Sequence, residues 1–150
     1  MSDLQDLYQQ LIIDHNRRPR NRRRLEQADR SCDGYNPLCG DRVTVHLKLQ
    51  DGVVQDAAFE GSGCAISTAS ASLMTESLKG KTPAQAGALF EKFRSLVTGE
   101  TPPPGNAAQL GKLEVFSGVC KYPARVKCAT LAWHTMNAAL TGATQPVSTE

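Results

Sequence analysis

Apolar and polar residues follow a helical period at both ends of the chain and again near its middle. From Asp3 to about His15, apolar residues recur at helical spacing and predict an amphipathic helix. A second helix is predicted from Thr82 to Gly99, since Thr82 suits an N-cap and Pro83 the first helical position. A long, largely apolar helix is expected from Pro123 to Gly142 and is expected to be central.

Between these helices, apolar residues recur at every second position. Val43, Val45, Leu47 and Leu49 alternate with polar residues, a pattern typical of a half-buried strand. The letters "QDG" then supply the Asp-Gly pair of a two-residue hairpin, and "VVQDAAFE" returns as the partner strand. We therefore expect an antiparallel sheet.

The returning strand leads through "GSGC" into a helix of small residues that ends at Gly80. Its predicted apolar ridge includes Ile66, Leu73 and Leu78. The stretch "TPPPGNAA" is a connector too short to divide domains, so residues 1–150 are expected to form one domain. Residues 142–150 are expected to form a frayed, flexible tail.

Composition narrows the classes of function. The 150 residues are 40% hydrophobic and 21% charged, which is ordinary for a globular domain that buries a core. The net charge of +2 and the aromatic fraction of 5% give no indication of nucleic acid as a partner. No apolar run approaches the roughly 18 residues of a membrane span, and "MSDLQDLYQQ" is unlike a signal peptide. A cytoplasmic protein without a membrane partner is expected.

Six arginines lie within Arg17 to Arg24, in the stretch "RRPRNRRR". Pro19 prevents a regular helix here, so the charges must remain in water or meet an acidic surface. The pattern leaves open a solvated loop, a docking segment for an acidic protein and, least favoured because aromatic residues are few, a nucleic-acid contact.

Three of the five cysteines lie where a thiol could act on a ligand. Cys39 follows a proline turn, and Asp41 two positions later can project the same way along an extended chain. Cys64 lies at a turn into a helix, where backbone amides and the helix dipole favour a thiolate. With Cys128 from the last helix, these side chains would make a tetrahedral set for zinc. Spacing alone leaves both interpretations open and favours the other one, a set of separate buried cysteines with Asp41 capping a turn.

Four stretches of the chain resemble a known family in combination: "LYQQLIIDHNRRPRN", "NPLCGDRV", "FEGSGCAISTASAS" and "YPARVKCATLAW". They are similar to the SufU-type members of the IscU-like iron–sulfur assembly proteins, over about Leu7 to Leu140. The resemblance implies an α+β fold in which a small antiparallel β-sheet packs against helices on one face.

Three features favour the SufU-type branch over the IscU-type branch. IscU-type proteins have a histidine before the last site cysteine, where this chain has Lys127. The Leu-Pro-Pro-Val-Lys chaperone motif of that branch is replaced by "KYPARVK". The helix from Thr82 to Gly99 is similar to the insertion that SufU-type proteins carry.

Carried over by residue, the resemblance implies a zinc site of Cys39, Asp41, Cys64 and Cys128. It implies that Cys39 accepts persulfide sulfur from a SufS-type cysteine desulfurase, with downstream iron–sulfur assembly proteins as further partners. Two alternatives remain: a scaffold that holds a nascent iron–sulfur cluster, and a purely structural zinc module.

Other residues are assigned more limited roles. Arg125 lies three residues before Cys128, close enough to touch the site, and Lys127 is a further candidate for contact with the site ligands. For Arg125 the alternatives are a charge partner of Asp41 and an ordinary exposed arginine. Cys32 and Cys120 lie outside the cysteine pattern of the family and are interpreted as incidental. No chemistry is assigned to the three histidines.

Overall fold

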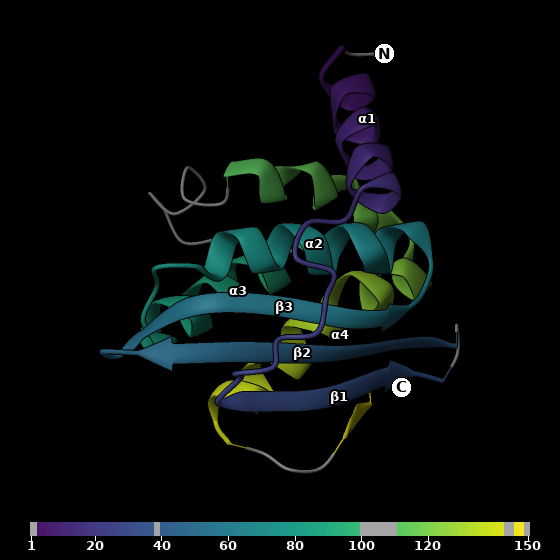
Figure 1. The fold of residues 1–150 in the computed structure, drawn as a ribbon. Coiled ribbons are helices and arrows are strands. Elements are labelled where there is room, and N and C mark those ends of the chain that lie inside the picture. Colours follow the sequence, from purple (N-terminus) through teal and green to yellow (C-terminus); the bar gives the residue numbers. More distant parts are fainter. Residues whose placement is uncertain (1–2, 38–39, 100–110, 143–145, 149–150) are drawn as a thin grey trace.

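Four strands form one sheet in the order β3-β2-β1-β4, and helices cover one of its faces (Figure 1). The computed structural model describes residues 3–37, 40–99, 111–142 and 146–148. The elements are α1 (Asp3–Arg17), β1 (Arg30–Asn36), β2 (Asp41–Gln50), β3 (Val53–Ser62), α2 (Ala65–Leu78), α3 (Pro83–Thr98), the 3₁₀ helix η2 (Gly111–Lys121), α4 (Pro123–Leu140) and β4 (Val147–Ser148). The predicted α+β class is confirmed.

The predicted hairpin is confirmed in detail. β2 and β3 pair in antiparallel fashion, and Gln50 faces Val53 across a two-residue turn. Asp51 and Gly52 have φ angles of 55° and 78°, which is the left-handed geometry that an Asp-Gly hairpin requires. The alternate residues of β2 are buried as their period of two predicts.

β1 was not expected from the sequence, because its inward positions are not large apolar residues. Cys32, Gly34 and Asn36 face inward, and their neighbours along the strand are exposed. A Cβ atom at Gly34 would collide with the side chain of Thr135 on α4. The small inward residues of β1 therefore let α4 lie close against this part of the sheet.

The C-terminal segment corrects two expectations. Val147 and Ser148, within the tail expected to fray, form β4 and pair with Gly34 and Tyr35 of β1. This pairing is parallel, so the sheet is mostly rather than wholly antiparallel. Because β4 covers the edge of β1, it satisfies backbone groups that would otherwise form an open sheet edge.

α2 is buried on nearly all sides, whereas the sequence indicated one apolar ridge. Its buried residues are Ser67, Thr68, Ala69, Ser70, Ala71, Ser72, Leu73, Met74, Thr75 and Leu78. The hydroxyl of Ser70 donates to the carbonyl of Ala129 and accepts from Trp133 Nε1 at 3.1 Å. Small residues let α2 and α4 approach closely, and their hydroxyl groups find partners inside the core.

α3 begins and ends where its sequence signals predict. Thr82 and Gln85 form a reciprocal capping box, and Gly99 closes the helix with a φ of 83°. Phe93 stacks on Trp133 of α4 with ring centroids 4.6 Å apart. The connector "TPPPGNAA" lies outside the described residues, and the 3₁₀ helix η2 after it was not expected. In the described part of the chain, no helix has both the length and the apolar character that a membrane span requires.

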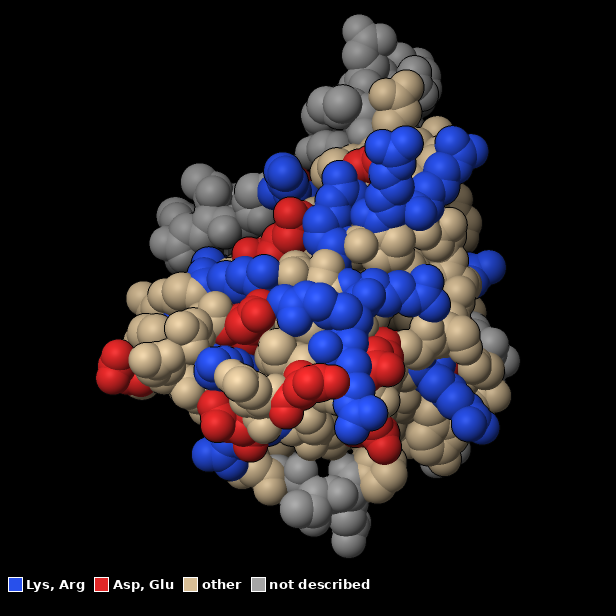
Figure 2. Space-filling model, in the orientation of Figure 1, with Lys and Arg blue, Asp and Glu red and all other residues tan. Residues whose placement is uncertain are grey.

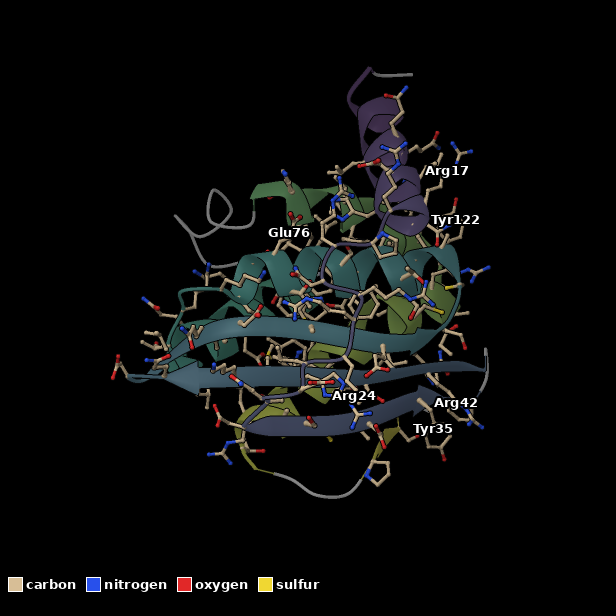
Figure 3. The ribbon with its side chains drawn as sticks, viewed as in Figure 1. Arg17, Arg24, Tyr35, Arg42, Glu76 and Tyr122 are labelled. Atoms are coloured by element: carbon tan, nitrogen blue, oxygen red, sulfur yellow. The ribbon has the colours of Figure 1, made fainter. Side chains whose placement is uncertain are left out.

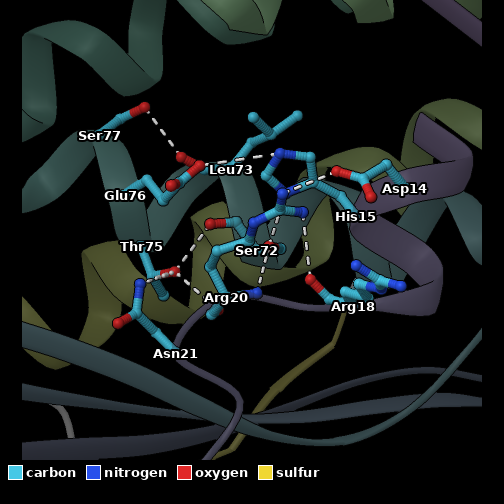
Figure 4. A network of polar contacts seen from close by, with 10 residues as sticks. All are labelled: Asp14, His15, Arg18, Arg20, Asn21, Ser72, Leu73, Thr75, Glu76 and Ser77. Carbon is cyan, nitrogen blue, oxygen red and sulfur yellow. Dashed lines mark hydrogen bonds and ion pairs between the residues drawn. The ribbon is translucent and has the colours of Figure 1, made fainter. Parts of the chain in front are cut away.

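A buried histidine joins α1 to α2 (Figure 4). His15 Nδ1 lies 2.7 Å from the hydroxyl of Ser72, and Nε2 lies 3.7 Å from a carboxylate oxygen of Glu76. The backbone N–H of Arg20 donates to the same Ser72 hydroxyl at 2.8 Å. Burial, followed by the nearby charge of Arg20, lowers the pKa of His15 below its usual value. His15 is therefore part of the α1–α2 contact, in surroundings that disfavour its charged form.

Candidate metal and thiol site

Three side chains from different elements meet at one end of the sheet. Asp41 is the first residue of β2, Cys64 lies between β3 and α2, and Cys128 lies in the second turn of α4. One ligand atom from each lies within 4.8 Å of the other two. Asp41 and Cys128 are buried, and Cys64 is half-buried. The fold thus brings together three residues that the sequence separates by up to 87 positions, since 128 − 41 = 87.

Cys64 forms the N-cap of α2. Its sulfur accepts the backbone N–H of Ser67 at 3.4 Å, as a side chain at this position does in an ordinary capped helix. The backbone N–H of Cys64 in turn donates to Asp41 Oδ1 at 3.0 Å. The partial positive charge at the start of α2 favours negative charge on both side chains. A Cβ at Gly63 would lie only 3.0 Å from Asp41 Oδ1, so the glycine leaves room for this carboxylate.

Cys128 is held from two sides. Its sulfur lies 3.7 Å from the carbonyl of Ala124, one turn earlier in α4. The side-chain amide of Asn36 lies 3.9 Å from the same sulfur and is completely buried at the end of β1. Sequence reasoning missed Asn36, although it stands directly before the proline turn. The alternation of inward and outward residues along β1 could have indicated Asn36, but β1 itself was not predicted.

Arg125 is exposed and lies beside the sulfur atoms. A hydrogen bond to Cys128, together with the charges on Cys64 and Cys128, raises the pKa of Arg125 above its usual value. Asp41, the charge partner considered from the sequence, is not among the groups that shift this pKa. Within the described residues, the ammonium group of Lys127 forms no hydrogen bond or ion pair.

The remaining cysteines have different surroundings. Cys39 lies outside the described residues, but Gly40 is described and its N–H donates to the carbonyl of Asn36 at 2.8 Å. Cys39 is two residues from Asp41, so their Cα atoms are at most about 7 Å apart. Cys32 is buried in the hydrophobic core, and burial raises the pKa of its thiol. The side chain of Cys120 is likewise outside the described part.

The donor set and its spacing suit zinc. Zinc bonds of about 2.3 Å to sulfur and 2.0 Å to oxygen place neighbouring tetrahedral ligands about 3.5–3.8 Å apart. Cys64 Sγ lies 3.9 Å from Asp41 Oδ2, and the full spread of 4.8 Å requires only small rotations of the side chains. Two thiolates and a carboxylate leave one tetrahedral position for a further ligand.

The family model of the NifU-like N-terminal domain matches residues 7–140. The chain belongs to this family. The match covers every element from β1 to α4 and all but the first turn of α1, and it includes Asp41, Cys64 and Cys128.

Curated relatives in the NifU-like family include both SufU and IscU proteins. The chain is 43% identical over 132 residues to the zinc-dependent sulfurtransferase SufU of Bacillus subtilis, covering 88% of each chain. It is 40% identical over 140 residues to the iron–sulfur cluster assembly scaffold protein IscU of Thermotoga maritima, covering 93% of this chain and 96% of the relative.

Solved structures of family members have the same fold. A crystal structure of a proposed iron–sulfur cluster assembly scaffold protein for the SUF system, from Fervidobacterium islandicum, superposes with a TM-score of 0.81 and 34% identity. The alignment covers 87% of this chain and 93% of that one. The N-terminal part of a NifU-like protein from Brucella abortus gives a TM-score of 0.80 at 27% identity, covering 93% and 96%.

Proposed function

We propose that this chain is a zinc-dependent sulfur carrier. It accepts sulfane sulfur from a SufS-type cysteine desulfurase and passes it to iron–sulfur cluster assembly proteins in the cytoplasm. The observation that carries the proposal is the close grouping of Asp41, Cys64 and Cys128. Identity of 43% to a protein named as a zinc-dependent sulfurtransferase supports this choice of metal and reaction.

Asp41, Cys64 and Cys128 would hold the metal, and Cys39 would provide the fourth ligand. Bound zinc lowers the proton affinity of thiols, so the cysteine ligands are held as thiolates at neutral pH. Positive charge in the fold would stabilise these thiolates, because the start of α2 and the guanidinium of Arg125 both lie beside the sulfur atoms. Asn36 directs its amide toward Cys128 Sγ and fixes the position of that ligand.

The proposed step is a transfer of sulfur between two cysteines. The Cys39 thiolate attacks the terminal sulfur of the desulfurase persulfide and forms a new S–S bond. The original S–S bond breaks, and its electron pair remains on the desulfurase cysteine as a thiolate. Atoms and electrons balance without an external oxidant or reductant. Cys39 suits this role because it comes from the connection between two strands, whereas Cys64 and Cys128 belong to helix α2's cap and to helix α4.

A scaffold function is the second candidate. The same thiolates serve iron as well as zinc, and a scaffold named IscU shares 40% identity with the chain. Metal content distinguishes the two functions. A sulfur carrier should contain close to one zinc per chain as isolated, whereas a scaffold should carry an iron–sulfur chromophore that survives purification.

Mass spectrometry after incubation with desulfurase and cysteine tests the sulfur-carrier proposal. Zinc-loaded wild-type protein should gain one sulfur on the peptide that contains Cys39, and Cys39→Ser should gain none. Cys32 and Cys120 in the same digest serve as internal controls for nonspecific reaction. Sulfur mapped to Cys64 or Cys128, or wild-type transfer to Cys39→Ser, would contradict the proposal.

A further inference from the structure

The arginine-rich segment after α1 is fixed to the body of the protein. The backbone N–H of Phe59 donates to the carbonyl of Asn21, and the N–H of Arg23 donates to the carbonyl of Phe59, each at 3.0 Å. Arg22 pairs with Phe59 as an isolated parallel bridge beside β3. The segment therefore covers the outer edge of β3 and is not a loosely solvated loop.

Of the six arginines in residues 17–24, three have side-chain ion pairs or hydrogen bonds to α1 or β3 within the described residues. Arg20 forms an ion pair with Asp14 at 2.7 Å, and Arg23 contacts both carboxylate oxygens of Asp56 at 2.8 and 2.9 Å. Arg22 donates to the carbonyl of Gly61 at 2.6 Å. We call Arg20, Arg22 and Arg23 the anchoring arginines, because these contacts attach the segment to α1 and β3.

Arg17, Arg18 and Arg24 form a second group, the outward arginines. All three are exposed, and within the described residues their guanidinium groups form no hydrogen bond or ion pair. Figure 2 shows Lys and Arg side chains gathered over the lower end of α1 and the segment that follows it. Arg17 and Arg24 both appear on this view of the molecule in Figure 3. A rigid backbone thus presents three guanidinium groups to solvent.

Two exposed side chains with apolar surface, Ile13 and Tyr122, accompany these charges, and Tyr122 is labelled below Arg17 at the upper right of Figure 3. Ile13 is 47% exposed and lies one helical turn before Arg17, so both project from the same side of α1. Tyr122 is 63% exposed and stands at the N-cap of α4, six residues before Cys128. The residues that contribute most of the binding energy in protein–protein interfaces are often arginine and tyrosine, accompanied by a few aliphatic residues.

We propose that the outward arginines, with Ile13 and Tyr122, dock an acidic surface of the protein that delivers sulfur to the thiol site. This inference rests on the proposed function, which names that protein as the cysteine desulfurase. Guanidinium groups recognise carboxylates through paired hydrogen bonds, and their fixed backbone reduces the entropy lost on binding. Acidic residues lie between the basic ones on the lower half of the same face (Figure 2), which opposes a continuous contact with a phosphate backbone.

The test compares two triple variants of equal charge. Arg17→Gln/Arg18→Gln/Arg24→Gln removes the outward arginines. The control Lys81→Gln/Lys92→Gln/Arg94→Gln removes three charges on and just before α3. Association with a SufS-type desulfurase encoded in the same genome is followed by stopped-flow fluorescence at low salt and at about 0.5 M salt.

We expect the first variant to associate roughly tenfold more slowly than wild type at low salt, with the difference disappearing at high salt. The control should stay within about twofold of wild type, and circular dichroism should show that both variants are folded. A wild-type association rate for the first variant, or equal slowing of the control, would overturn the docking surface.

Two further outcomes separate this inference from the proposed function. If the arginine variant binds slowly but wild-type protein receives no sulfur on Cys39, the docking surface stands and the sulfur-carrier function fails. If wild-type protein does not bind the desulfurase at low salt, both fail. A 30-base-pair DNA duplex is the second probe: binding tighter than to the desulfurase, and lost in the arginine variant, would overturn the acidic protein in favour of nucleic acid.

Discussion

Asp41 has two separable contacts, and substitutions can remove them one at a time. Oδ1 accepts the backbone N–H of Cys64 at 3.0 Å, while Oδ2 lies 3.9 Å from Cys64 Sγ, on the side where a metal would bind. Asp41→Ala removes both contacts. Asp41→Asn keeps an oxygen that can accept the Cys64 N–H, but replaces the negative ligand atom with an NH₂ group.

The structure sets the expected magnitude for the metal-free protein. Asp41 is 2% exposed, so loss of the acceptor leaves the Cys64 N–H poorly satisfied, at a cost of about 1–2 kcal/mol. Loss of negative charge beside the start of α2 costs about another 0.3–1 kcal/mol. Asp41→Ala should therefore lower the free energy of unfolding by about 2 kcal/mol, which corresponds to about 4–8 °C in Tm. Asp41→Asn should cost less than about 1 kcal/mol.

Two assays on the same samples test these expectations. Thermal unfolding in excess chelator gives the stability of the metal-free proteins, and competition with a chromophoric chelator gives zinc affinity. Both variants should bind zinc at least about tenfold more weakly, since each lacks the carboxylate ligand. If Asp41→Asn destabilises the metal-free protein as much as Asp41→Ala does, the hydrogen-bond argument is wrong. If either variant binds zinc with wild-type affinity, Asp41 is not a ligand.

Two other predictions concern stability. Removal of zinc from wild-type protein should lower Tm, because metal binding adds to the free energy of folding; an unchanged Tm after verified removal would contradict the ligand set. Acidification should also destabilise the fold, since burial lowers the pKa of His15 and of His134, and the unfolded chain therefore binds more protons. Stability should fall as pH drops below about 6.5, by at most about 1.4 kcal/mol per pH unit for each histidine, and level off below the folded-state pKa. His15→Gln should weaken this pH dependence of stability, while His134→Gln should keep the contribution of His15. An unchanged profile in His15→Gln would refute the lowered pKa of His15.

The elements predicted correctly are those with strong local signals. Asp51 and Gly52 determine their own turn through left-handed backbone geometry, and Thr82 caps α3 through contacts within four residues. β1 lacked such a signal because Gly34 and Asn36 are inward for reasons that lie on α4: close packing against Thr135 and a contact with Cys128. The burial of α2 on nearly all sides depends in the same way on partners distant in sequence.

The candidate site shows the same division. Spacing placed Cys64 at a helix start and Asp41 at a strand start, but it favoured separate buried cysteines over a metal site until motif resemblance was added. Their proximity follows from the pairing of β2 with β3, which brings the start of one strand beside the end of the other. The arginine run shows more clearly what the sequence alone cannot predict. Nothing in the sequence distinguishes its six charges, and only tertiary contacts distinguish Arg20, Arg22 and Arg23 from the outward arginines.

The connection between β1 and β2 contains Cys39, the proposed sulfur acceptor, and joins two other residues of the site. Its flanking residues, Asn36 and Asp41, pair across the sheet, and each contacts a different thiol: Asn36 reaches Cys128 and Asp41 reaches Cys64. Any force that draws the two thiols and the carboxylate together therefore also acts on both ends of the connection that contains Cys39. Under the proposed function, zinc binding and the position of Cys39 would therefore be coupled by covalent geometry, because Cys39 is two positions before Asp41. If Cys39 is the fourth ligand, as proposed, its exchange away from the metal would leave Asp41, Cys64 and Cys128 supported by strands and helices. The proposed acceptor could then leave the ligand set without loss of the other three ligands.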